Sequence, residues 1–256
     1  MRITMLGCGG SQGVPTAAGD WGLCDPGDPR NRRRRVSVMI EAGEGDALRR
    51  LLIDTTPDFR DQMLDAGVRH LDGVLYTHAH ADHLHGVDDL RAFNRVMGRP
   101  IPIWANEATL ADIHRRFGYA IGTPPGSFYR PTLIPHRFDG PFQAAGFDII
   151  PFDQDHGFSR STGFRIGDFA YSTDVVTLSD ADFELLAGVS VWIVDCVRIE
   201  PHPTHSHLER TLEWIAKVKP GRAVLTHMDI TLDYADLAKR LPPGVIPGHD
   251  GLVIDL

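Results

Sequence analysis

The heptapeptide THAHADH, residues 77–83, concentrates three histidines and one aspartate in a short stretch. Neutral imidazole nitrogens and carboxylate oxygens are ligands for zinc, manganese and iron. The stretch therefore predicts one side of a metal site, provided that other parts of the chain supply the remaining ligands. Its candidate ligands are His78, His80, Asp82 and His83.

Further candidate ligands stand where apolar, strand-like runs end. FDIIPFDQD runs into His156, FAYST into Asp174 and RAVLT into His227, as GVLYT runs into His78. In layered α/β folds the ends of strands are where loops converge and ligands bind. A lone polar residue after a strand more often serves a turn. Together, however, the four runs complete a set of seven: His78, His80, Asp82, His83, His156, Asp174 and His227.

Seven side chains exceed what one tetrahedral ion takes, and they suit two ions that share a bridging carboxylate. Side chains in an extended segment alternate with period two, so His78 and His80 are expected to point the same way. We therefore expect a first ion held by His78, His80 and His156, a second held by Asp82, His83 and His227, and Asp174 as the bridge.

The elements that must position these residues alternate short apolar runs with amphipathic segments, which is typical of mixed α and β layers. The ligands span positions 78 to 227 without an evident linker or repeat, so a single domain over 1–256 is expected. A helix is predicted over TPDFRDQMLDAG, with Thr56 as its N-cap, Pro57 in its first turn and Gly67 at its end. Residues 118–140 are rich in proline, glycine and aromatics, and they predict an ordered loop that could act as a lid.

Composition narrows the setting of the protein. With 42% hydrophobic residues the chain can build a core, and no apolar window approaches the length of a membrane span. The start, MRITMLGCGG, has no secretory apolar segment. The cysteines are odd in number and widely spaced, which favours a reducing, cytoplasmic location: Cys8, Cys24 and Cys196. A net charge of −8 disfavours a stable nucleic-acid partner. No membrane partner is expected, and a homodimer is compatible with the sequence.

The pattern H-x-H-x-D-H after a strand, followed by His, Asp and His on later strands, resembles the metallo-β-lactamase superfamily over essentially the whole chain. The resemblance implies a four-layer αββα sandwich with a dinuclear site along one edge of its sheets. It implies two divalent ions, manganese or zinc, with iron as a further option. It also implies that Asp54, in LLIDT, orients a metal-bound histidine by accepting its free N–H.

The stretch THSHLERTLEW points to one branch of that superfamily. His205 lies 22 residues before His227 (227 − 205), and in the phosphodiesterase branch a histidine at this offset contacts the substrate phosphate and protonates the leaving oxygen. His207 and His202 compete for this role. LGCGGSQGVP, DPRNRRRRVSVMI and PGHDGLVIDL resemble the phosphoribosyl 1,2-cyclic phosphate phosphodiesterases of phosphonate breakdown. Arg34 and Asp250 thereby become candidate substrate contacts, as does His207.

One departure from that group concerns cysteine. Its members commonly hold a structural zinc with closely spaced cysteines, whereas WGLCDPGDPRN contains only Cys24, so no structural zinc is expected. The predicted activity is the hydrolysis of small phosphodiesters, cyclic ribosyl or nucleotide compounds, to phosphomonoesters. In this mechanism His205 is the general acid, and Asp82, besides ligating, orients the nucleophile.

Three alternatives stay open. A thioesterase or lactone hydrolase on the same scaffold would share all seven ligands without needing His205. A tRNA 3′-processing-type endonuclease is disfavoured because the interval FSRSTGFRIGDFAYST is too short for the RNA-gripping arm of those enzymes. A non-catalytic nucleotide- or metal-binding regulator would retain the ligands without turnover.

Overall fold

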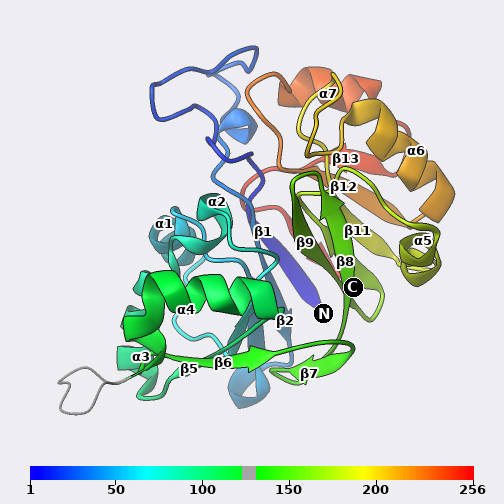
Figure 1. Ribbon diagram of the computed structural model, residues 1–256. Helices are drawn as coiled ribbons and strands as arrows, with labels where there is room; N and C mark the ends of the chain where they lie inside the picture. The colour runs from blue at the N-terminus through cyan, green and yellow to red at the C-terminus, as the bar shows by residue number, and fades with distance from the viewer. Residues whose placement is uncertain (123–130) are drawn as a thin grey trace.

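The computed structural model describes residues 1–122 and 131–256. In that part of the chain two seven-stranded sheets pack face to face, and helices cover the outer side of each (Figure 1). This arrangement is the four-layer αββα sandwich that the sequence predicted. The first sheet has the order β14 (Val253–Asp255), β1 (Arg2–Gly7), β2 (Ser37–Ala42), β3 (Arg49–Ile53), β4 (Gly73–Leu75), β5 (Ile101–Ala105) and β6 (Leu133–Arg137).

The second sheet pairs the later part of the chain. Its order is β13 (Val245–Pro247), β12 (Arg222–Thr226), β11 (Val191–Asp195), β10 (Phe169–Ser172), β9 (Ser159–Ile166), β8 (Phe147–His156) and β7 (Phe142–Ala144). β3 to β6 run parallel, as do β10 to β13, so the carboxyl ends of each parallel set meet at one edge. That edge can therefore collect the residues that follow the strands.

Helices flank the two sheets on opposite sides (Figure 1). The first sheet carries α1 (Phe59–Asp65), α2 (Ala81–Leu84), α3 (Leu90–Met97) and α4 (Glu107–Ile121). The second carries α5 (Asp180–Leu186), α6 (Leu208–Val218) and α7 (Tyr234–Arg240). Short 3-10 turns occur at η1 (Pro29–Asn31), η2 (Gly45–Ala47) and η3 (Val87–Asp89). Within the described ranges no helix combines the length and apolar character that crossing a membrane requires.

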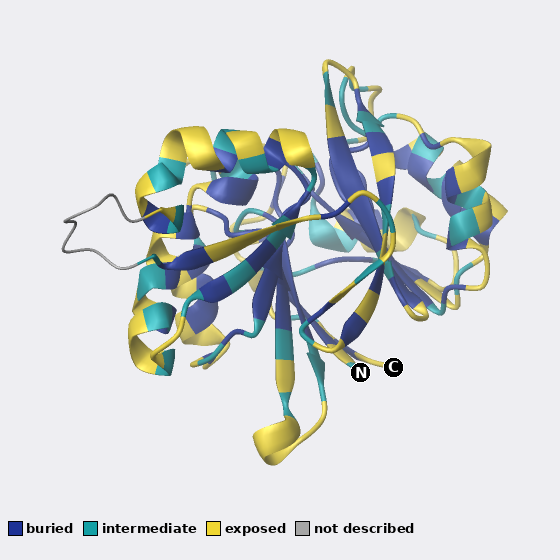
Figure 2. Cartoon of the chain, turned by 60° about the horizontal axis from the view of Figure 1, so that its bottom comes forward, coloured by how far each residue is buried: buried dark blue, intermediate teal, exposed yellow. Residues whose placement is uncertain are grey.

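Two apolar cores hold the layers together. Successive side chains of a strand point to opposite faces. Accordingly, Leu51 of β3 packs in the core between the sheets, and its neighbour Leu52 packs in the core under the helices. The first sheet is thus buried on both faces, which explains uninterrupted apolar runs such as LLI. Figure 2 shows this pattern as dark strands between helices whose outer faces are exposed.

Two sequence-based boundaries need correction. The predicted first helix begins at Phe59 rather than beside Thr56, because the Thr56 hydroxyl accepts a hydrogen bond from the Asp58 amide in a turn before the helix. Gly67, in the left-handed conformation, follows the helix end as predicted. The stretch 118–140 is not one loop: its start belongs to α4 and residues 133–137 form β6. Residues 123–130 of the predicted lid lie outside the described residues.

Candidate metal centre

The predicted ligands converge at the edge where the parallel strands end. Two of them, Asp174 after β10 and His227 after β12, have left-handed backbone with φ values of 55° and 59°, as has Asp54 after β3 with 63°. Residues other than glycine rarely adopt this left-handed conformation, and such strain clusters at functional sites. Here it occurs just after the ends of three strands at this edge.

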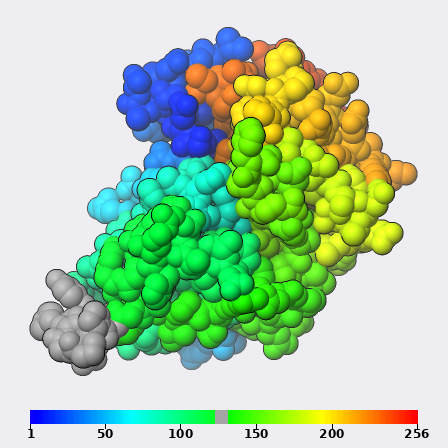
Figure 3. All heavy atoms as spheres, in the orientation of Figure 1, coloured from blue at the N-terminus to red at the C-terminus, as the bar shows by residue number. Residues whose placement is uncertain are grey.

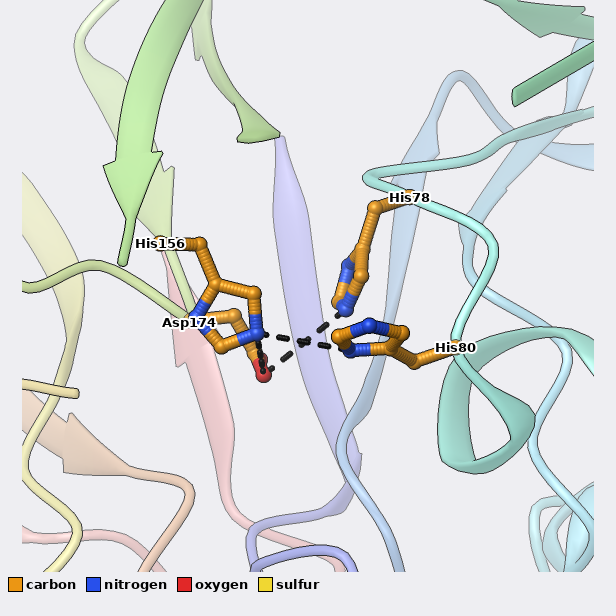
Figure 4. Close-up of side chains that lie close together, drawn as sticks. All are labelled: His78, His80, His156 and Asp174. Carbon is orange, nitrogen blue, oxygen red and sulfur yellow. Dashed lines mark hydrogen bonds and ion pairs between the residues drawn. The ribbon is translucent and has the colours of Figure 1, made fainter. Parts of the chain in front are cut away.

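A first group of ligands joins both sheets. His78 and His80 come from the loop after β4, His156 ends β8, and Asp174 follows β10; one ligand atom from each lies within 4.8 Å of the others (Figure 4). The Asp174 Oδ1 atom is 3.5 Å from Nε2 of His156 and 3.8 Å from Nε2 of His78. The group has the membership that the spacing in the sequence predicted for one ion and its bridge.

A second group shares Asp174. Its Oδ2 atom is 3.1 Å from Nε2 of His83 and 3.5 Å from Nε2 of His227. Asp82 completes this group, with its Oδ2 atom 3.3 Å from His83 Nε2 and 3.5 Å from His227 Nε2. Asp174 therefore directs one carboxylate oxygen to each group, which is the geometry expected of a bridging ligand.

Hydrogen bonds on the far side of the rings fix how two histidines face the centre. Nδ1 of His83 lies 2.7 Å from Oδ2 of Asp54, whose other oxygen accepts the Thr77 amide at 2.8 Å. Nδ1 of His156 donates to the Thr204 carbonyl at 2.7 Å. Such partners set the tautomer and leave Nε2 free for a cation. Asp54 thus lies where its carboxylate can accept the N–H of His83.

The centre contains buried nitrogens that the protein leaves unsatisfied. Among the described residues, Nε2 of His78, His83 and His227 is buried without a well-directed hydrogen bond, although carboxylate oxygens lie nearby. Buried polar atoms are normally paired, so unpaired nitrogens converging with carboxylates fit divalent cations. The donor set of imidazoles and carboxylates suits zinc, manganese or iron.

The electrostatics of the centre also favour bound cations. Burial opposes ionisation of Asp174, yet the imidazoles of His227, His83 and His205 hold its pKa well below the usual range. Burial likewise opposes protonation of His227, but Asp174 and the neighbouring carboxylates raise its pKa to about 9. The buried carboxylates are therefore stabilised by nearby positive charge, which protons on the imidazoles or metal cations can supply.

His205 lies beside both ligand groups. Its imidazole contacts Asp195, a residue that the sequence analysis did not identify. Its Nδ1 atom is 3.2 Å from Oδ2 of Asp195 and 3.8 Å from Oδ1 of Asp174. Asp195 ends β11, is fully buried, and also accepts the amides of Val175 and Ser206. The signal that could have found it is the one used elsewhere: a carboxylate at the end of an apolar run, in VSVWIVDC.

The other candidate residues lie apart from the ligand groups. The His202 ring centroid is 5.0 Å from that of His205, so His202 sits one ring further out. His207 is buried at the start of α6. Arg34 pairs with Asp65, and its amide donates to Asp250, which also accepts the Cys8 amide. Arg34 and Asp250 therefore line a different cavity and are not brought to the centre.

Two cavities open beside the centre. One, of about 340 Å³, is lined by the exposed sides of the ligand groups and by Ser11, Phe158, Ser159, Thr204 and His205. The other, of about 410 Å³, contains Gln12, Arg198, His202 and Thr231 and shares Ser11 and His205 with the first. His205 thus stands between a space in front of the ligands and a second space behind it.

Comparison with known proteins gives the context for this geometry. A family model for the beta-lactamase superfamily domain matches residues 49–228. An octanoyltransferase of Porphyromonas gingivalis is 33% identical over an alignment of 261 positions, gaps included, that covers 98% of this chain and 51% of that protein. A ribonuclease Z of Clostridium kluyveri is 29% identical over 68% of this chain and 49% of that protein. The chain spans about half the length of these curated relatives.

Solved structures match over the whole chain. A diphosphatase of the PhnP family is 36% identical with a TM-score of 0.90, covering 100% of this chain and 97% of that one. The zinc-bound PqqB of Methylobacterium extorquens covers 100% of both chains with a TM-score of 0.76, but at 20% identity it shows a common fold alone.

Proposed function

This chain belongs to the beta-lactamase superfamily, and from that premise we propose that it is a dinuclear-metal hydrolase of small phosphodiesters. One observation carries the proposal: two ligand groups share Asp174, and His205 lies beside both. The likeness to a diphosphatase of the PhnP family supports chemistry at phosphorus. The substrates we propose are cyclic ribosyl or nucleotide phosphodiesters, and the product is a phosphomonoester.

The residues divide into ligands and residues that act on the substrate. Divalent ions bound by the two groups would supply a nucleophile from water at neutral pH and would offset charge on the phosphoryl oxygens. The proposed ligands are His78, His80 and His156 for one ion, Asp82, His83 and His227 for the other, and Asp174 for both. We assign Asp82 the additional role of orienting the attacking water.

His205 is the proposed general acid. Its Nδ1 atom faces Asp195, which leaves Nε2 to carry the proton that the leaving oxygen needs. When the phosphorus–oxygen bond to the leaving oxygen breaks and the cyclic ester opens, that proton passes to this oxygen, which remains on the sugar as a neutral hydroxyl. Asp195 acts as a positioning residue, because its buried carboxylate contacts Nδ1 and fixes the orientation of the ring.

A substrate panel tests this function. The protein is loaded with manganese or zinc, its metal content is measured, and it is offered bis-p-nitrophenyl phosphate, a nucleoside 2′,3′-cyclic phosphate, lactoylglutathione and an octanoyl thioester. We expect turnover of the phosphodiesters and none of the thioesters. Preferred turnover of a thioester would contradict the proposal and favour the thioesterase alternative, with which the name of the octanoyltransferase relative is compatible.

The tRNA-processing alternative is less well supported. Between His156 and Asp174 the chain consists of β9, β10 and their short turns, so this interval holds no long arm for gripping RNA. The non-catalytic alternative predicts metal binding without turnover of any member of the panel.

A further inference from the structure

The turn between β8 and β9 carries an aromatic ring that the fold itself does not use. His156 pairs with Ser159 across the hairpin, so Gly157 and Phe158 form a two-residue turn. Phe158 is 96% exposed. One exposed apolar residue is ordinary on a protein surface. Phe158 differs from such residues because it lies beside the candidate metal centre.

The turn needs glycine at its first position but not phenylalanine at its second. Gly157 has a φ of +71°, and its amide donates to Oδ1 of Asp155 at 2.9 Å. A Cβ atom on Gly157 would lie 2.8 Å from the Pro203 carbonyl oxygen, so glycine also permits close contact with the segment 203–204. Two-residue hairpins with glycine first accept small polar residues in the second position. Neither packing nor turn geometry therefore explains the ring of Phe158.

The ring is held at the mouth of the centre by a well-anchored hairpin. β8 and β9 pair along their whole shared length, and the tip contacts the segment before His205. In Figure 3 this hairpin, in light green, stands next to the yellow segment that follows β11. Phe158 lines the same cavity as His80, Asp82 and Asp174, and among the described residues that line it, Phe158 is the one with a carbocyclic ring.

We propose that Phe158 stacks against the base of a nucleotide whose phosphate group lies at the ligand groups. The inference rests on the proposed function and narrows its substrate class to nucleotides. The same cavity is lined by Ser11, Ser159 and Thr204, whose hydroxyls can hydrogen-bond to a sugar. Phenylalanine offers only its ring face, so recognition depends on stacking and not on hydrogen bonds to base edges. Purines should therefore bind more tightly than pyrimidines, and stacking adds about 5- to 150-fold in affinity.

Binding measurements test the proposal without requiring turnover. Calorimetry on the manganese-loaded protein compares adenosine 5′-monophosphate with ribose 5-phosphate, two phosphomonoesters that differ by the base. We expect the wild type to bind the nucleotide about 10-fold more tightly. Phe158→Ala should remove this difference and leave ribose 5-phosphate binding unchanged, whereas Phe158→Trp should preserve it. An equal affinity of the wild type for both probes, or an unchanged difference in Phe158→Ala, overturns the proposal.

A matched control and a second substrate pair separate this inference from the proposed activity. Val96→Ala removes an exposed apolar side chain on α3, away from the centre, and should change neither affinity. Adenosine 2′,3′-cyclic phosphate is then compared with methyl riboside 2,3-cyclic phosphate in turnover. If neither is hydrolysed while the binding difference persists, the phosphodiesterase proposal fails and the stacking role of Phe158 stands. If both are hydrolysed with equal kcat/KM, the stacking role fails and the phosphodiesterase proposal stands.

Discussion

Two regions of the described structure gather charged side chains, and they are built on opposite principles. The first is the candidate metal centre at the strand ends. The second is a groove of about 510 Å³ beside β14 and α1, which contains Arg2, Arg34 and Arg50. In the groove each guanidinium faces a carboxylate of the protein: Arg2 faces Asp255 at 2.9 Å, Arg50 faces Glu41 at 2.7 Å, and Arg34 faces Asp65.

The difference lies in what each region leaves unsatisfied. The arginines of the groove are already paired, so an anion entering it would have to displace a protein carboxylate. At the centre, buried Nε2 atoms of His78, His83 and His227 converge without a directed partner. Unsatisfied buried atoms are costly, and they persist where a ligand completes them. An arginine-rich sequence is therefore a weaker sign of a binding site than a set of unpaired imidazoles.

The largest expected effect comes from removing the shared ligand. Asp174→Ala takes one oxygen from each ligand group, so we expect metal content and turnover to fall together. The loss should exceed the 10- to 100-fold typical of residues that only support a ligand. Metal analysis by mass spectrometry and phosphodiester turnover measure it. Asp65→Ala, which makes the same substitution in the groove, is the matched control and should retain both.

Removing the general acid should separate metal binding from chemistry. His205→Ala is expected to keep its metal and to lose roughly 10²- to 10⁴-fold in kcat, the usual contribution of acid–base catalysis. Asp195→Asn should lose less, because the ring remains but its support is weakened. His202→Ala, at the next ring outward, serves as the control. A kcat in His205→Ala equal to that of the wild type would remove this residue from the mechanism.

A smaller effect is expected from a change at Asp54, which contacts the ligand His83 on the side away from the centre. Asp54→Asn keeps an acceptor for His83 Nδ1 at its 2.7 Å contact but removes the negative charge. Outer partners of metal-bound histidines typically contribute 10- to 100-fold to metal affinity or activity. Metal titration followed by turnover at saturating metal tells which of the two is affected. Unchanged values for both would show that the carboxylate serves folding alone.

In the groove we expect no effect on activity. The expected change is in the free energy of unfolding and its dependence on pH. Burial raises the pKa of Asp250 to about 6, above its usual value. The folded protein therefore favours the protonated carboxyl, and the free energy of unfolding should fall as pH rises from about 4 to 6, by roughly 3 kcal/mol at most. Asp250→Asn should remove this pH-dependent part while losing the hydrogen bond from the Arg34 amide. Chemical denaturation at several pH values measures it; an identical pH slope in the variant would contradict the prediction.

Part of the fold could be predicted from the sequence because local patterns of apolar residues encode strands. The apolar runs GVLYT, FDIIPFDQD, FAYST and RAVLT contain or form most of β4, β8, β10 and β12. β9 was not predicted, since SRSTGFRI contains few apolar residues and forms a strand through its pairing with β8 and β10. β6 lay within a predicted loop: Pro135 is tolerated there because β6 is the edge strand of its sheet.

The sequence by itself determined which chemical groups are available and where along the chain they occur: the histidines and aspartates after the strands, in an order that divides them into two groups. Only the tertiary structure decided that Asp195 supports His205, that Arg34 and Asp250 face another cavity, and that Phe158 stands at the mouth of the centre. The physical reason is that hydrophobic periodicity reports the neighbours of a residue along one strand or helix. Which strand ends meet is set by pairing between segments far apart in the chain, here by the parallel order of two facing sheets.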